Sequence, residues 1–341
     1  MESIYWVINH ACHRKCKHCY DDRFRPYVRD ALEKKIAESE AAFPKILENL
    51  PDRLGYRAED GTDYYGRVIM AGGEVLVDKV RQRVLYPILE GLQKKYDGRV
   101  HIIIQTTGDL VTDEILDELL ARNVWLVSVA GMDDYHVGHE GEKRLPVMDR
   151  LHALFHSRGM VQMNEYEPVR LSAQTAHTWY NMFGATEDAW IGKLWPRGRA
   201  WLNGLTTATL DDNFCNAWSG GLSFLNHGEA GSEVSIEPDG KVYPCCLKTA
   251  APLGDLTQEK LIDMLDALRA EPALQAINSG DPAAMGENYG WSREHFIERA
   301  SAKMPNGIVC NNLCLGCDAF FGDVLGPVLE KSARVRLDRS A

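Results

Sequence analysis

Apolar and polar positions alternate along the first half of the chain in blocks that predict strands and helices in turn. The strand blocks are rich in branched and aromatic residues, and the helix blocks repeat apolar residues at three- and four-residue intervals. Strands are predicted at 4–10, 64–74, 99–110, 123–131 and 160–166, and helices at 27–50, 80–96, 112–123 and 145–159. This alternation predicts a parallel sheet with its reactive groups at the carboxyl ends of the strands.

Three residues modify the predicted helices. Pro44 is expected to interrupt the first helix and Pro87 to kink the second, because proline removes a backbone donor and crowds the preceding turn. Thr112 is expected to cap the third helix, which continues with acidic residues.

The second half of the chain is less regular. Residues 167–210 are difficult to assign, whereas 234–244 predict a β-hairpin around an Asp-Gly turn. The length of 341 residues is sufficient for two domains. We place them at 1–205 and 206–341.

Charge and composition narrow the possible partners. The chain has 38 basic and 49 acidic side chains and a formal net charge of −11, which argues against binding to nucleic acid or anionic lipid. The basic residues Arg14, Lys15 and Lys17 are better explained as a solvated or cofactor-facing loop than as a nucleic-acid patch. The sequence shows no targeting segment and no long apolar run, so we predict a cytoplasmic protein without membrane contact.

Cysteines are the most informative residues. The nine cysteines fall into two groups, three within residues 12–19 and six within 215–317, a distribution that favours metal binding over disulfides. In the first group Cys12, Cys16 and Cys19 have C-x3-C-x2-C spacing. Thiolates select iron–sulfur clusters, zinc or cuprous copper. Structural zinc normally has four ligands, so the alternative to an open site is a zinc site completed by a nearby histidine, of which there are three: His10, His13 and His18.

The cysteine spacing, directly after the first predicted strand, resembles the signature of the radical S-adenosylmethionine (radical SAM) superfamily. His18 departs mildly from the aromatic residue that usually precedes the third cysteine. The resemblance implies a partial (βα)6 barrel of the TIM type. It also implies a four-iron four-sulfur cluster with one open iron, S-adenosylmethionine as cofactor, and an external electron donor of the flavodoxin or ferredoxin type.

Further residues match this resemblance at the ends of predicted strands. A Gly-Gly-Glu sequence ends the second strand, although Val75 replaces the proline that often follows it. Considered alone, each position is more often an ordinary turn residue. The resemblance implies cofactor contacts at Gly72, Gly73, Glu74, Thr106, Thr107 and Ser128.

The loop 131–143 concentrates polar groups after the fourth strand. It is either a solvated loop or a wall facing the substrate with groups able to exchange protons. Tyr135 and His136 are therefore catalytic candidates.

The second cysteine group resembles the auxiliary-cluster extensions called SPASM and twitch domains, here as a small α+β cysteine-rich domain with a hairpin. The features that match are an early cysteine, a Gly-x4-Cys hairpin and a late C-x2-C. The resemblance implies one auxiliary four-iron four-sulfur cluster held by Cys215, Cys245, Cys314 and Cys317. Cys246 and Cys310 remain as substitute ligands, catalytic candidates or small buried residues, and a structural zinc site is the alternative for the whole group.

The expected function is reductive cleavage of S-adenosylmethionine to give a carbon radical that modifies a small metabolite or natural-product intermediate. One alternative is maturation of a ribosomally made peptide or protein, which the short segment of eleven residues before Cys12 makes less favoured. A second is aminocarboxypropyl transfer to a thiophilic substrate such as trivalent arsenic. The non-enzymatic alternative is a zinc-stabilised binding module.

Overall fold

The computed structural model describes residues 1–163, 178–185, 193–217 and 219–340. A nine-stranded sheet runs through the molecule in the order β11-β10-β9-β1-β4-β5-β6-β8-β7. Its barrel strands are parallel, as predicted for a partial TIM-type barrel. They are β1 (Ser3–Asn9), β4 (Arg67–Gly72), β5 (His101–Thr106), β6 (Val124–Ala130), β8 (Trp179–Phe183) and β7 (Val161–Gln162).

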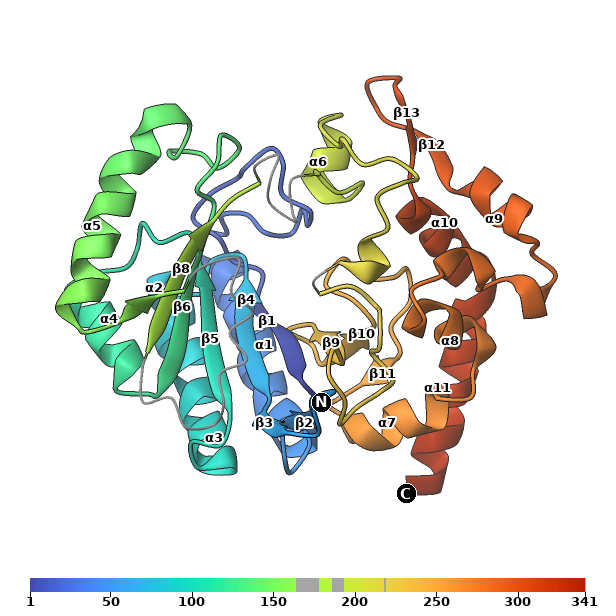
Figure 1. The fold of residues 1–341 in the computed structure, drawn as a ribbon, viewed down its shortest axis with the longest axis horizontal. Helices are drawn as coiled ribbons and strands as arrows, with labels where there is room; N and C mark the ends of the chain where they lie inside the picture. The colour runs from blue at the N-terminus through green and yellow to red at the C-terminus, as the bar shows by residue number, and fades with distance from the viewer. Residues whose placement is uncertain (164–177, 186–192, 218, 341) are drawn as a thin grey trace.

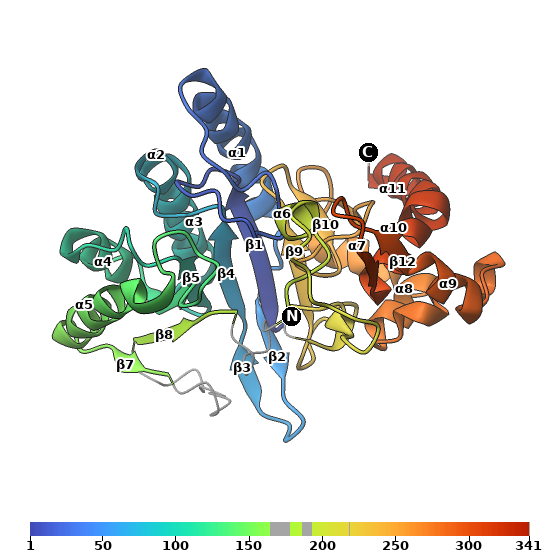
Figure 2. The ribbon, with the colours of Figure 1, turned by 90° about the horizontal axis from the view of Figure 1, so that it is seen from above.

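Helices cover the outer face of these strands (Figure 2). They are α1 (Asp30–Asn49), α3 (Tyr86–Tyr96), α4 (Asp113–Leu120) and α5 (Arg144–Ser157). Alternate residues of β1 show the two faces, because Ile4, Trp6 and Ile8 pack under the helices, whereas Tyr5 and Val7 belong to a separate interior cluster. A short hairpin of β2 (Gly55–Arg57) and β3 (Asp63–Tyr65) lies apart from the main sheet.

The helix predictions are confirmed with one correction. The interruption predicted at Pro44 is wrong, because α1 continues through it and the buried side chains of Ile36, Ala42 and Ile46 keep the helix packed on the sheet. Near Pro87, α2 (Asp78–Val80) passes through a π-helical turn at Arg81–Leu85 into α3. A π-helical turn relaxes the regular helix where proline cannot donate. Thr112 caps α4 as predicted, accepting a hydrogen bond from Ile115 N at 3.3 Å.

Two strand pairings were not predicted from the sequence. The predicted strand 160–166 is short, with only Val161–Gln162 as β7, and residues 164–166 lie outside the described residues. The strand next to β6 is instead β8, which the pattern of residues 167–210 does not reveal. The predicted hairpin forms as β9 (Glu233–Ile236) and β10 (Lys241–Tyr243), and β9 pairs in parallel with β1.

The remaining C-terminal elements lie to the right of the barrel in Figure 1. The helices are α6 (Gly198–Leu202), α7 (Leu261–Leu268), α8 (Pro272–Asn278), α9 (Arg293–Arg299), α10 (Leu313–Phe320) and α11 (Gly326–Ser340). The strands are β11 (Gly254–Asp255), β12 (Ser301–Lys303) and β13 (Val309–Asn311). Within the described part of the chain, no helix has the length and apolar character needed to cross a membrane.

Candidate active site

The first three cysteines lie on the loop that leaves the carboxyl end of β1, at the top of Figure 1. Cys16 is buried and Cys12 and Cys19 are partly buried, and all three are free thiols. Backbone N–H groups approach two of the sulfurs: Arg14 N lies 3.4 Å from Cys12 Sγ, and Val137 N lies 3.5 Å from Cys16 Sγ. The loop thus carries three thiols, and backbone N–H groups donate hydrogen bonds to two of them.

Arg199 of α6 holds this loop together from the inside. Its side chain is 6% exposed, and its guanidinium donates to the carbonyls of Cys16, Asp22 and Phe24 at 2.8, 3.0 and 2.7 Å. Its backbone N–H donates to Cys19 O at 2.8 Å. A rigid fork of donors is suited to this task, so one residue fixes the backbone around two of the three thiols.

The pKa values of the three thiols are consistent with a metal site. Burial raises the pKa of Cys12 to about 12 and that of Cys19 to about 11, so both are neutral thiols until a metal displaces their protons. Burial also raises the pKa of Cys16, although the Val137 N–H, Arg14 and Arg199 oppose part of this rise. A negatively charged cluster with thiolate ligands fits these surroundings.

Two of the three histidines proposed for a closed zinc site, His10 and His13, bond to carboxylates. His10 Nε2 lies 3.0 Å from Glu237 Oε2, and His13 Nε2 lies 2.7 Å from Asp109 Oδ2. His18 is neutral at ordinary pH, because burial lowers its pKa to about 4, and its ring contacts that of His136 with centroids 4.4 Å apart. With His10 and His13 held by carboxylates, the three thiols fit a cluster that leaves one metal position open.

Glu74 connects the ends of two barrel strands. Its carboxylate is 2% exposed and accepts from Thr106 Oγ1 at 2.8 Å, Thr107 N at 2.8 Å, Thr107 Oγ1 at 2.9 Å and Leu76 N at 3.0 Å. The structure thus brings together three of the predicted cofactor residues in one network. It uses the Glu74 side chain to join the ends of β4 and β5.

Gly73 packs directly on the start of the cysteine loop. A Cβ atom added there would lie 2.2 Å from Ala11 O, so only glycine permits this approach. Gly72 precedes it at the end of β4. Ser128, the remaining predicted cofactor residue, is buried on β6 opposite Gln105 of β5.

The loop that follows β6 packs over the cysteine loop. Asp133 is buried and accepts from the backbone N–H of both Tyr135 and His136, and its Oδ1 lies 2.9 Å from His136 Nδ1. These contacts and the nearby His136 ring hold the pKa of Asp133 well below its usual range despite burial. Tyr135 and His136 are thus positioned beside His18, with which their rings are in contact.

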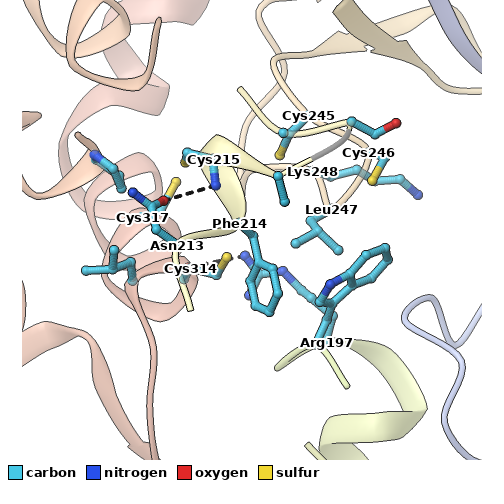
Figure 3. A pocket seen from close by; sticks show the side chains of 16 residues that line it. Arg197, Asn213, Phe214, Cys215, Cys245, Cys246, Leu247, Lys248, Cys314 and Cys317 are labelled. Atoms are coloured by element: carbon cyan, nitrogen blue, oxygen red, sulfur yellow. Dashed lines mark hydrogen bonds between the residues drawn. The ribbon is translucent and has the colours of Figure 1, made fainter. Parts of the chain in front are cut away.

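The second thiol site is shown in Figure 3, where four sulfurs point toward a common space. The four sulfurs belong to Cys215, Cys245, Cys314 and Cys317, which come from three segments of the C-terminal half. These cysteines line one pocket together with Trp195, Arg197 and Phe214. Burial raises the pKa of each thiol, to about 12 for Cys314. Arg197 donates to Cys314 O at 3.2 Å and pairs with Asp318, placing a cation beside thiols that a metal would deprotonate.

Cys246 and Cys310 are oriented differently. Cys246 lines the same pocket, but in Figure 3 its sulfur points away from the other four, and it belongs to the interior cluster with Tyr5 and Val7. Cys310 lies on β13, buried, with its sulfur 3.8 Å from Ala208 O, and it is not among the residues that line the pocket.

An aromatic series connects the two thiol sites within the interior cluster. Tyr20 follows Cys19, and its ring contacts Trp195 with centroids 5.1 Å apart. Trp195 in turn contacts Phe214, which precedes Cys215, at 6.1 Å. Tyr5 adds hydrogen bonds to Tyr20 at 3.3 Å and Gln105 at 2.9 Å. Both thiol sites therefore border one largely apolar interior.

Two residues with structural roles at these sites were not found from the sequence. Arg199 gave no signal beyond its Gly-Arg-Ala context, because its role depends on carbonyls about 180 residues away. Asn312 is fully buried, caps α10 by accepting from Cys314 N at 3.0 Å, and donates to Thr209 O and Asp212 O. An Asn directly before a helix that carries two cysteines is a capping signal.

A partial parallel barrel with a thiol triad after its first strand, joined to a second thiol site, defines a class of two-site iron–sulfur enzymes. Comparison with protein-family models supports this reading. Residues 6–166 match the model described as the radical SAM superfamily, and residues 229–285 match the SPASM model, described as an iron–sulfur cluster-binding domain. The chain belongs to the radical SAM superfamily and contains a SPASM iron–sulfur domain. Its cofactors therefore include a four-iron four-sulfur cluster, S-adenosylmethionine and auxiliary iron–sulfur.

Several solved structures are similar to this chain, whereas no curated protein matches it. BtrN in complex with AdoMet and 2-DOIA is 14% identical, with 82% of this chain and 88% of that chain covered and a TM-score of 0.45. The anSMEcpe structure with bound AdoMet and Cp18Cys peptide is 14% identical, with coverages of 97% and 98% and a TM-score of 0.44. SuiB from Streptococcus suis bound to S-adenosylmethionine is 10% identical, with coverages of 86% and 75% and a TM-score of 0.40. The family assignment rests on the sequence-model matches alone.

Proposed function

We propose that this enzyme cleaves S-adenosylmethionine reductively and uses the resulting carbon radical to modify a small metabolite or natural-product intermediate. The observation that carries the proposal is the thiol triad Cys12, Cys16 and Cys19, whose neighbouring His10 and His13 bond to carboxylates rather than to the thiols. A cluster held there would keep one iron for the cofactor. When bound, the cluster and cofactor together supply a 5'-deoxyadenosyl radical.

The chain's own residues would then bind and orient the cofactor. Gly73 brings backbone against the cysteine loop, and Glu74 holds the carboxyl ends of β4 and β5 together. We propose that these groups, with Ser128 on β6, form the cofactor-facing edge of the barrel: Gly72, Gly73, Glu74, Thr106, Thr107 and Ser128. The packed loop after β6 would exclude water from this edge.

The second thiol site would hold one auxiliary cluster through Cys215, Cys245, Cys314 and Cys317, all of which line one pocket. This cluster would lie in the proposed C-terminal domain, 206–341, whereas the first cluster would lie in the proposed barrel domain, 1–205. Cys246 is the catalytic candidate that the geometry favours most, because its sulfur faces the interior cluster instead of the other thiols. Tyr135 and His136 are candidates for proton exchange beside the cysteine loop.

A small substrate is supported by the interior that both thiol sites border. Apolar and aromatic side chains pack between the two thiol sites, and Tyr5 donates there to Gln105; a mostly apolar lining with a few polar groups is common for small-molecule sites. The reducing electron would come from an external one-electron donor of the flavodoxin or ferredoxin type.

Anaerobic reconstitution followed by product analysis tests the proposal. We expect a brown protein that contains iron and sulfide and that releases 5'-deoxyadenosine from S-adenosylmethionine with dithionite. Release of methylthioadenosine would instead indicate aminocarboxypropyl transfer. A colourless protein that binds only zinc would contradict the proposal.

A further inference from the structure

Basic residues are concentrated on the segment that carries the thiol triad. Residues 13–29 contain six Lys or Arg residues and two acidic residues, whereas the whole chain has a net charge of −11. The segment is therefore locally positive on an acidic protein. Such an asymmetry steers a partner of opposite charge toward one face.

Four of these cations are exposed and have no acidic partner. Within the described ranges, no carboxylate lies at ion-pair distance from Lys15, Lys17, Arg25 or Arg29. The two other cations of the segment are used internally, because Arg14 pairs with Asp109 and Arg23 with Asp21 and Glu237. Exposed, unpaired cations contribute little to folding, so their concentration at this position calls for another explanation.

Lys15 and Lys17 lie on either side of Cys16. Both lysines are exposed, whereas Cys16 is 6% exposed, so the metal site lies one residue beneath this surface. Asn203 donates to Lys17 O at 3.0 Å, so the end of α6, where Leu202 is 55% exposed, lies next to the backbone of Lys17. An apolar side chain bordered by cations is typical of a surface for transient charged partners.

We propose that Lys15, Lys17 and Leu202 form the docking surface for a small acidic protein that carries a one-electron redox centre. This inference rests on the proposed function, because it assumes that a cluster at the triad receives its electron from outside. Lys15 and Lys17 are the chain neighbours of Cys16, so a carrier bound to them would lie close to this thiol. The step moves one electron from the reduced carrier to the cluster and changes no bond in the chain.

The test uses the double variant Lys15→Glu/Lys17→Glu with an acidic flavodoxin and, separately, an acidic ferredoxin as probes. Its matched control is Lys94→Glu/Lys331→Glu, which reverses the same two charges on exposed positions of α3 and α11. Rates of cluster reduction by each carrier are divided by the rate with dithionite on the same preparation. We expect this ratio to fall about tenfold for the first variant at low ionic strength and to stay near wild type for the control.

A second measurement does not depend on activity. Binding of the oxidised carrier to cluster-free protein should weaken as salt rises, and the Lys15→Glu/Lys17→Glu variant should lose most of that salt dependence. Equal losses in both double variants, or no effect with either carrier, would overturn the docking surface. Cleavage of S-adenosylmethionine with dithionite would still proceed in that case, so failure of the docking surface is distinguishable from failure of the proposed function.

Discussion

Arg199 organises the metal-binding loop by satisfying backbone groups. The loop around the thiols leaves carbonyls without partners in regular structure, and a buried guanidinium supplies several donors in fixed geometry. Its importance therefore lies in positioning the loop that carries the thiols.

Replacing Arg199 with methionine should release the thiol loop. The variant leaves three buried carbonyls without a donor, and we expect a loss of about 3 kcal/mol in unfolding free energy. Iron content should fall at the first thiol site and persist at the second. The control is Arg158→Met, whose ion pairs with Asp113 and Asp117 are on the surface, so this variant should change the unfolding free energy little. Full iron loading of the Arg199 variant would contradict this role.

The cysteines of the second group provide a matched pair of substitutions. Cys245→Ala should remove the auxiliary cluster, because its sulfur faces the other three thiols. Cys310→Ala should retain it, at a cost of about 1 kcal/mol for the small cavity formed. Iron and sulfide per chain distinguish the two variants, and loss of iron in both would assign Cys310 as a ligand.

At the scale of elements, local periodicity was sufficient for most of the barrel. The strands at β1, β4, β5 and β6 and the helices between them follow from their own residues, as does the β9–β10 hairpin. The parallel pairing of β9 with β1 and the placement of β8 beside β6 did not follow. Pairing of strands that are distant in sequence depends on tertiary packing, which periodicity does not record. The spacing of the cysteines in the sequence was sufficient to predict the candidate ligands. The hydrogen bonds by which Arg199 and Asn312 hold the neighbouring backbone join segments distant in sequence, so they became visible only in the folded structure.

The β1–β9 pairing buries an acidic side chain. Glu233 lies opposite Ser3 and is 7% exposed, and burial raises its pKa above 4.5. Because the folded state then holds the proton more tightly, the contribution of Glu233 to stability is greatest below about pH 4.5 and is lost as pH rises through the raised pKa. Glu233→Gln should therefore raise Tm at pH 8 relative to wild type, with a smaller gain near pH 4.5.

The control for Glu233 is Glu229→Gln, an exposed position just before β9. This variant should leave Tm nearly unchanged at both pH values. A Tm gain for Glu233→Gln that does not depend on pH would show that the carboxyl charge is not the cause.

Pro44 in α1 provides a second test at this scale. The residue is exposed within a continuous helix, so alanine restores a backbone donor without disturbing the core. We expect Pro44→Ala to raise the unfolding free energy by about 1 kcal/mol, less than the full proline penalty because the unfolded chain also gains freedom. Denaturant unfolding with an unchanged m-value would check this, and a loss of stability in the variant would contradict the expectation.

The whole molecule joins two thiol sites through one interior. The sheet runs from the barrel into the C-terminal half through β1 and β9, and the interior cluster includes Cys19 of the first site and Cys245 and Cys314 of the second. The same buried side chains therefore pack between the two thiol sites.

The most direct test examines the first site alone. In a Cys215→Ala/Cys245→Ala variant, the remaining cluster is reduced with dithionite and its electron paramagnetic resonance spectrum is recorded before and after addition of S-adenosylmethionine. Our account predicts a four-iron four-sulfur signal whose g values shift when the cofactor binds to the open iron. A signal unchanged by the cofactor, or a preparation that contains zinc and no iron, would contradict it.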